Sequence, residues 1–310
     1  MDSNKVLPNL EVVYTLDALK GWSYTGTSLA VLGHPIAHSI SPQMHNAALK
    51  AMAKNNPELS HWGYFKFDIP PEQFSEALSL FHSKGFLGLN LTVPHKVISL
   101  SLLKKVSTTA QRIGAVNTLL HRAEGYTGYN SDGYGLERAL KEELGVELSG
   151  ASVILLGAGG ASRAAAVQCL EKGCRELWIG NRSQDRLNAL LNTLKTVEGY
   201  GKIHSFELGT EVEHKGIPRT GVLVNATSLG LNREDPSPFN FDGFDASLKV
   251  YDMIYNPQET ALLRAAKGRG MKVANGLSML VYQGACSLEV WSGAEVPTEV
   301  MMEAARQAIS

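Results

Sequence analysis

The sequence is poor in the features that restrict function most directly. Its 310 residues include 3 cysteines, without Cys-x-x-Cys spacing or a paired histidine motif, which argues against a disulfide framework and against a bound structural metal. Lys and Arg total 29 against 30 Asp and Glu, so no global charge draws the chain to nucleic acid or to an anionic membrane. No run reaches the roughly eighteen apolar residues that span a bilayer.

Targeting signals are also missing from the N-terminal segment. Residues 1–25 have neither the basic start and apolar block of a signal peptide nor the arginine-rich, acid-free character of a transit peptide. Together with the few cysteines, this predicts a cytoplasmic protein whose partners are small molecules.

What is present is an ordinary globular composition in which strand and helix patterns alternate. At roughly 100 to 200 residues per domain, the length predicts two domains, and the alternation is typical of an α/β protein with mainly parallel sheets. The boundary is expected near residues 130–150, beside a helix at 133–144. Two helices are expected after Gly276, and their periodicity leaves open which domain they join. The first half is expected to form strands at 28–33, 63–69, 85–93 and 115–121 and helices near 42–54, 71–83 and 95–104.

The strongest local signal is VILLGAGGASRA, in which an apolar strand enters a glycine turn and then a helix. Gly157, Gly159 and Ser162 occupy the three positions of the dinucleotide fingerprint. Gly157 permits the tight turn, Gly159 lets the backbone approach a pyrophosphate, and the helix N-terminus offers amides that hold phosphate. The alternative is a glycine turn without a ligand, and the strand, turn and helix together favour dinucleotide binding.

The end of the next expected strand indicates which dinucleotide binds. An NAD site usually has an acidic residue about 20 residues after the glycine turn. This chain has Asn181, Arg182 and Ser183 there, with Arg186 close behind. The planar guanidinium fork matches a phosphate, so these residues favour NADP, with its 2′-phosphate, over NAD.

Polar residues also follow two expected strands of the first half. Ser39 and Ser41 suit a hydroxylated or carboxylated small molecule at a strand end, although Ser41 before a proline also predicts a helix N-cap. In GLNLTVPHK, period-2 alternation puts Asn90 and Thr92 opposite the apolar side chains, Val93 included, so that both can converge with Lys96.

Asp132, in GYNSDG, is a candidate partner for Lys96, although an acid just before a helix also predicts an N-cap. A lysine and an acid suit a dehydrogenase that acts on a secondary alcohol, because hydride leaves a carbon whose hydroxyl proton must go to a base. The residues leave open which of the two groups holds the proton at rest.

Nine blocks in order resemble the shikimate dehydrogenase family: SISPQMHN, GLNLTVPHK, IGAVNT, GYNSDG, GAGGASRA, NRS, NATSLGL, DMIYNPQET and GLSMLVYQG. The resemblance runs from about residue 28 to the C-terminus. It implies a substrate-binding α/β domain of residues 1–131 and 276–310 and a Rossmann-like NADP-binding domain with a parallel sheet at 132–275, with the last helices returning to the first domain. Departures from the family pattern include Ser131 in place of a threonine and Ser278 in place of a glycine.

The resemblance also implies roles for individual residues. Lys96 and Asp132 would form the catalytic pair, while His45 is interpreted as structural. The residues implied to bind substrate are Ser39, Ser41, Asn90, Thr92, Lys96, Asn117, Asp132, Tyr255 and Gln283. Those implied to bind the cofactor are Gly157, Ala158, Gly159, Gly160, Ala161, Ser162, Asn181, Arg182, Ser183, Arg186, Thr227, Ser228, Gly230, Met253 and Gly276.

The implied activity is reversible, NADPH-dependent reduction of 3-dehydroshikimate to shikimate in aromatic amino-acid biosynthesis. One alternative is a quinate/shikimate dehydrogenase that uses NAD, against which Arg182 and Arg186 argue. Another is a non-catalytic, NADP-sensing regulator, which the loss of Lys96 or Asp132 would have favoured; the sequence retains both. The family contains monomers and dimers, so a homodimer is among the expected assemblies.

Overall fold

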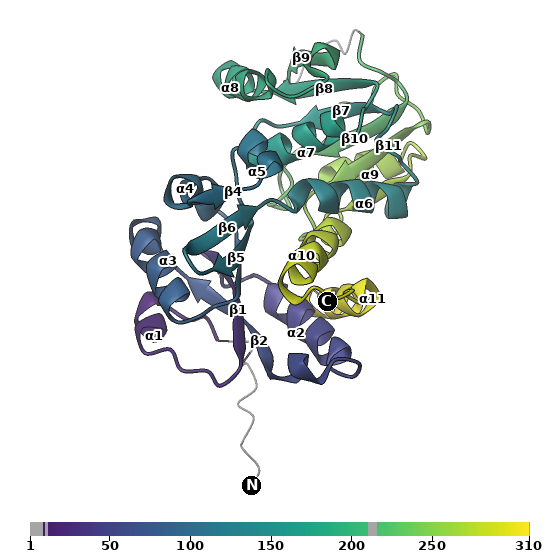
Figure 1. Cartoon of the computed structure of the whole chain (residues 1–310). Coiled ribbons are helices and arrows are strands. Elements are labelled where there is room, and N and C mark those ends of the chain that lie inside the picture. Colours follow the sequence, from purple (N-terminus) through teal and green to yellow (C-terminus); the bar gives the residue numbers. More distant parts are fainter. Residues whose placement is uncertain (1–8, 10–11, 210–215, 310) are drawn as a thin grey trace. The chain divides into compact units, whose positions relative to one another are not determined.

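The computed structural model describes residue 9, residues 12–209 and residues 216–309, which form two compact units (Figure 1). Unit 1 contains the described residues up to Gln111, Ala115–Ser131, and the chain from Gly284 onward; unit 2 contains Arg112–Gly114 and Asp132–Gln283. The expectations for residues 1–25 fall partly on residues 1–8 and 10–11, which lie outside the described residues. Each unit is α/β, as predicted.

Unit 1 is built on a six-stranded mixed sheet in the order β2-β1-β3-β5-β6-β4. The strand pairs β1–β2, β1–β3 and β4–β6 are parallel, whereas β5 is antiparallel to β3 and β6. The strands are β1 (Thr27–Gly33), β2 (Trp62–Asp68), β3 (Gly88–Leu91), β4 (Lys105–Val106), β5 (Thr118–Arg122) and β6 (Gly125–Tyr129). The helices are α1 (Leu16–Lys20), α2 (Ser41–Met52), α3 (Phe74–Ser83), α4 (His95–Ile98) and α11 (Thr298–Ala308); α5 (Thr108–Ile113) and α10 (Leu277–Ser292) each contribute to both units.

The two faces of this sheet differ in chemistry. Phe65 and Phe67 of β2 pack with Phe74 and Phe81 of α3 in a buried aromatic core on one face. A polar row crosses the opposite face, because Val31 of β1 is in register with both Lys66 of β2 and Asn90 of β3, and Asn90 pairs with Thr118 of β5. This row contains Asn90, which the sequence predicts to bind substrate.

Unit 2 has a six-stranded sheet in the order β12-β11-β10-β7-β8-β9, and every neighbouring pair is parallel. The chain crosses from one side of β7 to the other after β9, which is the switch point at which doubly wound sheets bind ligands. The strands are β7 (Ser152–Leu156), β8 (Glu176–Asn181), β9 (Ile203–Glu207), β10 (Gly221–Asn225), β11 (Leu248–Asp252) and β12 (Val273–Asn275). The helices are α6 (Asp132–Leu144), α7 (Gly160–Glu171), α8 (Gln184–Leu194) and α9 (Ala261–Lys267).

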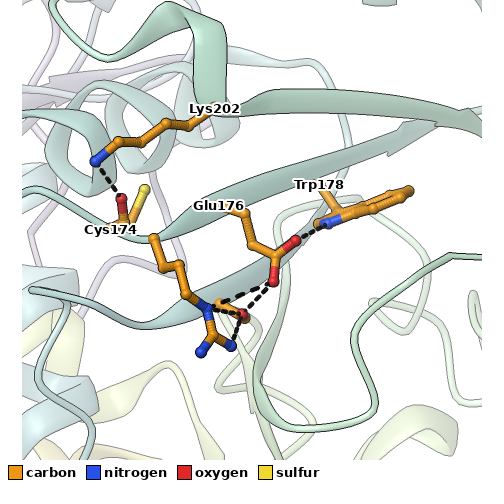
Figure 2. Close-up of polar contacts among 6 residues, drawn as sticks. Cys174, Glu176, Trp178 and Lys202 are labelled. Carbon is orange, nitrogen blue, oxygen red and sulfur yellow. Dashed lines mark hydrogen bonds and ion pairs between the residues drawn. The ribbon is translucent and has the colours of Figure 1, made fainter.

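A polar cluster joins the starts of β7 and β8 (Figure 2). The Glu176 carboxylate accepts hydrogen bonds from Ser152 Oγ (2.5 Å) and Trp178 Nε1 (2.9 Å), and Arg175 donates to the same serine. Lys202 Nζ donates to the carbonyl of Cys174 at 3.1 Å. Hydrogen bonds from Ser152 and Trp178 hold the pKa of Glu176 below its usual range. This cluster lies at the amino ends of the strands, opposite the ends where ligand residues are predicted, and its contacts are those of a structural brace.

One predicted strand is shorter than expected. The alternation through GLNLTV holds to Leu91, but β3 ends there and the chain turns, so Val93 is 71% exposed instead of packing beside Leu89 and Leu91. No helix in the described parts of the chain is both long and apolar enough to cross a membrane.

Candidate functional site

All residues predicted to contact only the cofactor lie in unit 2, at or after the carboxyl ends of strands in its sheet. The carboxyl ends of parallel strands form one edge, where open α/β sheets bind ligands. The segment after β7 holds Gly157, Ala158, Gly159, Gly160, Ala161 and Ser162. Asn181 ends β8, Arg182 and Ser183 follow it, and Arg186 lies in the first turn of α8. Thr227, Ser228 and Gly230 follow β10, Met253 follows β11 and Gly276 follows β12.

The turn after β7 has the geometry of a phosphate cradle. Gly157 has φ of +111°, which disfavours any residue with a side chain. A Cβ added at Gly159 or Gly160 would meet no atom within 4 Å, so the backbone there borders open space. Gly159 N-caps α7 without a side-chain hydrogen bond, which leaves the first-turn amides for a ligand. These residues fit a dinucleotide pyrophosphate.

The loop after β8 and the first turn of α8 each present one cation. Asn181 Nδ2 donates to the carbonyl of Ser183 (2.8 Å), and Ser183 Oγ accepts from the backbone N–H of Arg186 (3.3 Å), which caps α8. Arg182 and Arg186 are exposed, and no ion pair or side-chain hydrogen bond of either is found among the described residues. The loop is therefore shaped by Asn181 and Ser183, while both guanidinium groups are available to an anion.

The loop after β10 is held by a buried network. Asn225 Oδ1 accepts hydrogen bonds from the N–H (3.0 Å) and the hydroxyl (2.8 Å) of Thr227, and Asn225 Nδ2 donates to Asp252 (3.0 Å). Asp252 also accepts from Thr260 Oγ1 (2.6 Å) and from the N–H of Ile254 (3.1 Å). Burial raises the pKa of Asp252, and these donors oppose the shift. Thr227 is thus positioned by Asn225 and Asp252, which sequence reasoning did not identify.

Ser39 and Ser41 lie in unit 1, on the segment that leads from β1 into α2. Ser39 N–H donates to the carbonyl of Ile36 (3.0 Å), which closes a turn, and Ser39 Oγ accepts from Ser41 N–H at 3.4 Å. The helix begins at Ser41 itself, with Ile40 as an N-cap that makes no side-chain bond. The prediction of Ser41 as the N-cap is therefore wrong by one position, and its hydroxyl instead makes a hydrogen bond with Tyr64.

Asn90 and Asn117 are buried in one hydrogen-bond network of unit 1. Asn90 Nδ2 donates to Ser287 Oγ (3.0 Å) and to the carbonyl of Asn117 (3.1 Å), and Asn90 Oδ1 accepts from Tyr64 Oη (2.7 Å). Asn117 Oδ1 accepts from Thr118 Oγ1 (2.9 Å), which lies 2.7 Å from Ser287 Oγ. Sequence reasoning missed Tyr64, Thr118 and Ser287. Tyr64 and Ser287 contact Asn90 from 26 and 197 positions away along the chain, and Thr118 contacts Ser287 from 169 positions away.

Ser131 and His45 complete this part of unit 1. Ser131 donates its N–H to Asn117 Oδ1 (2.9 Å), and its hydroxyl accepts from Asn117 Nδ2 (3.0 Å), so the departure from threonine retains the hydrogen-bonding group. The His45 ring stacks on Tyr64 with centroids 3.9 Å apart, and its Nδ1 lies 2.9 Å from the carbonyl of Ser41. Burial lowers the pKa of His45 to about 4. These contacts agree with the interpretation of His45 as structural.

Lys96 is the second residue of α4, which is anchored in the core of unit 1. The neighbouring His95 is fully buried, stacks on Phe74 and places its Nε2 2.8 Å from the carbonyl of Ile69. The carbonyl of Lys96 accepts from Val116 N–H at 2.7 Å. The backbone of Lys96 is therefore fixed on two sides.

The remaining predicted substrate residues divide between the units. Thr92 belongs to unit 1, whereas Asp132, Tyr255 and Gln283 belong to unit 2. Asp132 is buried at the start of α6, Gln283 Nε2 donates to the carbonyl of Leu280 (2.8 Å), and burial raises the pKa of Tyr255.

The fold and these residues define a two-unit α/β chain in which one unit carries a dinucleotide-type turn and the other a buried, hydroxyl-rich polar network. Three family models match in order: the shikimate dehydrogenase substrate binding domain over residues 31–119, shikimate / quinate 5-dehydrogenase over 138–216, and the shikimate 5′-dehydrogenase C-terminal domain over 276–306.

Whole-chain relatives agree. The chain is 41% identical over 286 residues to a shikimate dehydrogenase (NADP(+)) of Symbiobacterium thermophilum, covering 92% of this chain and 95% of the relative. A solved shikimate dehydrogenase in complex with NADP+ aligns with a TM-score of 0.83 at 34% identity, covering 92% and 96% of the two chains. The Thermus thermophilus enzyme in complex with NADP(H) and shikimate aligns with a TM-score of 0.77 at 39% identity, covering 91% and 99%. The chain belongs to the shikimate dehydrogenase family.

Proposed function

We propose that this protein catalyses the reversible, NADPH-dependent reduction of 3-dehydroshikimate to shikimate, a step in aromatic amino-acid biosynthesis. The observation that carries the proposal is that the chain combines a dinucleotide turn, two exposed arginines, Lys96 and Asp132. Its relatives are named as shikimate dehydrogenases, and the similarity covers more than nine-tenths of their length. In the oxidative direction, shikimate and NADP+ give 3-dehydroshikimate, NADPH and one proton.

The proposed substrate-binding domain is residues 1–131 and 276–310, and the proposed NADP-binding domain is residues 132–275. These domains correspond to units 1 and 2 except at residues 112–114 and 276–283. Ser39 and Ser41 bind the substrate carboxylate, with Tyr255 contributing. The ring hydroxyls are contacted by Asn90, Thr92, Asn117 and Gln283. The buried amide network around Asn90 supports this role, because it fixes the orientation of the amide groups before a ligand arrives.

The proton of the reacting hydroxyl is handled by Lys96 and Asp132. NADP, when bound, supplies the hydride acceptor or donor. Lys96 exchanges a proton with the substrate oxygen, and Asp132 orients the ammonium group and the hydroxyl through its carboxylate. The anchored backbone of Lys96 supports this assignment, since a proton-transfer group must be held within hydrogen-bond reach of the reacting atom.

Cofactor choice rests on the β8 loop. Arg182 and Arg186 bind the 2′-phosphate of NADP, while the glycine turn binds the pyrophosphate. The quinate/shikimate dehydrogenase that uses NAD is disfavoured, because Arg182 and Arg186 supply two cations and residues 181–183 contain no carboxylate. A non-catalytic NADP sensor is disfavoured by the retained Lys96 and Asp132.

A kinetic comparison tests the proposal. The purified protein is assayed with shikimate and quinate, each with NADP and NAD, and kcat/KM is measured for the four combinations. The pair shikimate and NADP is expected to give the highest value. A dominant rate with quinate and NAD supports the first alternative, whereas NADP binding without turnover of any pair supports the second.

Two further proposals concern the setting of the enzyme. A cytoplasmic location is supported by the three free cysteines, of which Cys169 and Cys174 are buried and unpaired. The proposed assembly is a homodimer, and light scattering coupled to size-exclusion chromatography measures the mass that tests it.

A further inference from the structure

Lys66 is a buried lysine that the roles assigned above do not use. Lys66 lies on β2, in the polar row of the unit 1 sheet that also contains Asn90, and it is 5% exposed. Its ammonium group donates a hydrogen bond to the carbonyl of Ala37 at 3.0 Å. Within the part of the chain that the structure describes, this is the one hydrogen bond or ion pair of the Lys66 side chain.

Ala37 belongs to the turn that presents the proposed carboxylate-binding serines. The turn runs from Ile36 to Ser39 and is closed by the bond between their backbone groups (3.0 Å). Ser39 Oγ then accepts from the N–H of Ser41. Lys66 therefore places a positive charge against the segment on which Ser39 and Ser41 stand.

No carboxylate in the described chain neutralises this charge. Asp68, two residues further along the same face of β2, pairs through Oδ1 with Nδ1 of His34 at 2.5 Å. No ion pair between Lys66 and Asp68 is found within 4.0 Å among the described residues. A buried ammonium with a single carbonyl partner is costly and retains two N–H donors, so the site favours an anion from outside the chain.

We propose that Lys66 supplies the positive charge that recognises the substrate carboxylate held by Ser39 and Ser41. The inference rests on the proposed substrate site and extends it. Two hydroxyl groups favour a carboxylate over a neutral ester only through their own hydrogen bonds, whereas an adjacent ammonium adds a hydrogen bond between opposite charges, which only the acid can form. The ligand class is a small hydroxylated carboxylate.

Two substrates and four variants test this role. KM is measured for shikimate and for its methyl ester in Lys66→Gln, Lys66→Met and Lys66→Arg, with the exposed lysine variant Lys50→Gln as the matched control. Lys66→Gln and Lys66→Met are expected to raise KM for shikimate roughly 10- to 100-fold. The KM of the ester, the KM of NADP and kcat should change less than about twofold. Lys66→Arg should keep most of the discrimination, because it keeps the charge.

Several outcomes overturn the inference. An unchanged KM for shikimate in the neutral variants does so, and so does an equal rise for acid and ester, which would show that Lys66 only braces the turn. Thermal unfolding identifies a variant that does not fold. If both neutral variants fail to fold, Lys66→Arg decides, since an unchanged acid-to-ester ratio is then required.

Titration calorimetry with shikimate and its ester separates the inference from the proposed function. A wild-type protein that binds the acid in preference to the ester without turnover refutes the reaction and keeps the role of Lys66. A wild-type protein that turns over both equally refutes the role of Lys66 alone.

Discussion

The polar side chains of the two units are held in opposite ways. In unit 1, Asn90 and Asn117 are 6% and 1% exposed and are bound into one network with Thr118 and Ser287. In unit 2, the guanidinium groups proposed to bind the 2′-phosphate are exposed and, among the described residues, have no side-chain partner. Asn90 and Asn117 are therefore held in place by burial before a ligand arrives. The exposed arginines are expected to lose side-chain entropy when an anion binds.

The largest expected effect concerns Lys96 and Asp132, the residues proposed to handle the proton. Lys96→Ala is expected to lower kcat roughly 10³-fold, because the reacting hydroxyl loses its proton-transfer group. Asp132→Asn should cost less, since it removes orientation and charge but leaves the lysine. Steady-state assays at saturating shikimate and NADP measure both effects, with the exposed lysine variant Lys104→Ala as control. Full turnover in Lys96→Ala would refute the assignment of the pair.

The free energy of unfolding is expected to fall at acidic pH because of buried histidines in unit 1. Burial lowers the pKa of His45 to about 4, whereas an unfolded histidine titrates near 6.5. Between these values the unfolded state binds the additional proton. The contribution of neutral His45 to the free energy of unfolding is therefore complete above about pH 6.5, and about 3 kcal/mol of it is lost as the pH falls towards 4. His95, whose pKa burial also lowers, acts in the same direction.

Urea unfolding between pH 8 and pH 4.5 measures this dependence. His45→Gln should flatten the decline in the free energy of unfolding, although its absolute stability falls because the stacking on Tyr64 is lost. The exposed His61→Gln serves as control and should leave the decline as it is. A decline of the same slope in His45→Gln would contradict the burial argument.

The exposed arginines give the next effect. Arg182→Ala and Arg186→Ala are each expected to raise KM for NADP roughly tenfold or more, and to leave KM for NAD nearly unchanged, because only NADP carries the 2′-phosphate. Added salt should raise KM for NADP more in the wild type than in these variants. Arg264→Ala, an exposed arginine outside the cofactor loops, is the control. An equal rise in KM for NADP and for NAD would contradict the proposal that these arginines bind the 2′-phosphate.

The same contrast explains which parts were predictable from the sequence. The glycine turn, the β8 loop and the Lys96 segment are short, and each keeps its chemistry within a few residues of a strand end, so the pattern alone indicated them. Asn90 is hydrogen-bonded to residues 26 to 197 positions away along the chain, and no local pattern predicts such contacts. A strand is expected at 63–69, but the sequence assigns no role to Lys66, and only the register of the sheet shows that it shares a face with Asn90.

Matched removal of one hydroxyl from each unit sharpens the comparison most finely. Ser287→Ala takes an acceptor from Asn90 Nδ2 inside the buried network, so the free energy of unfolding should fall by about 2 kcal/mol and KM for shikimate should rise. Ser183→Ala removes the cap of α8 in a more accessible loop, so a loss of about 1 kcal/mol and a small rise in KM for NADP are expected. Urea unfolding and both KM values decide. The two variants could instead lower the free energy of unfolding equally, without a change in KM for shikimate in Ser287→Ala or for NADP in Ser183→Ala. That result would contradict the proposal that burial pre-organises the polar residues of unit 1.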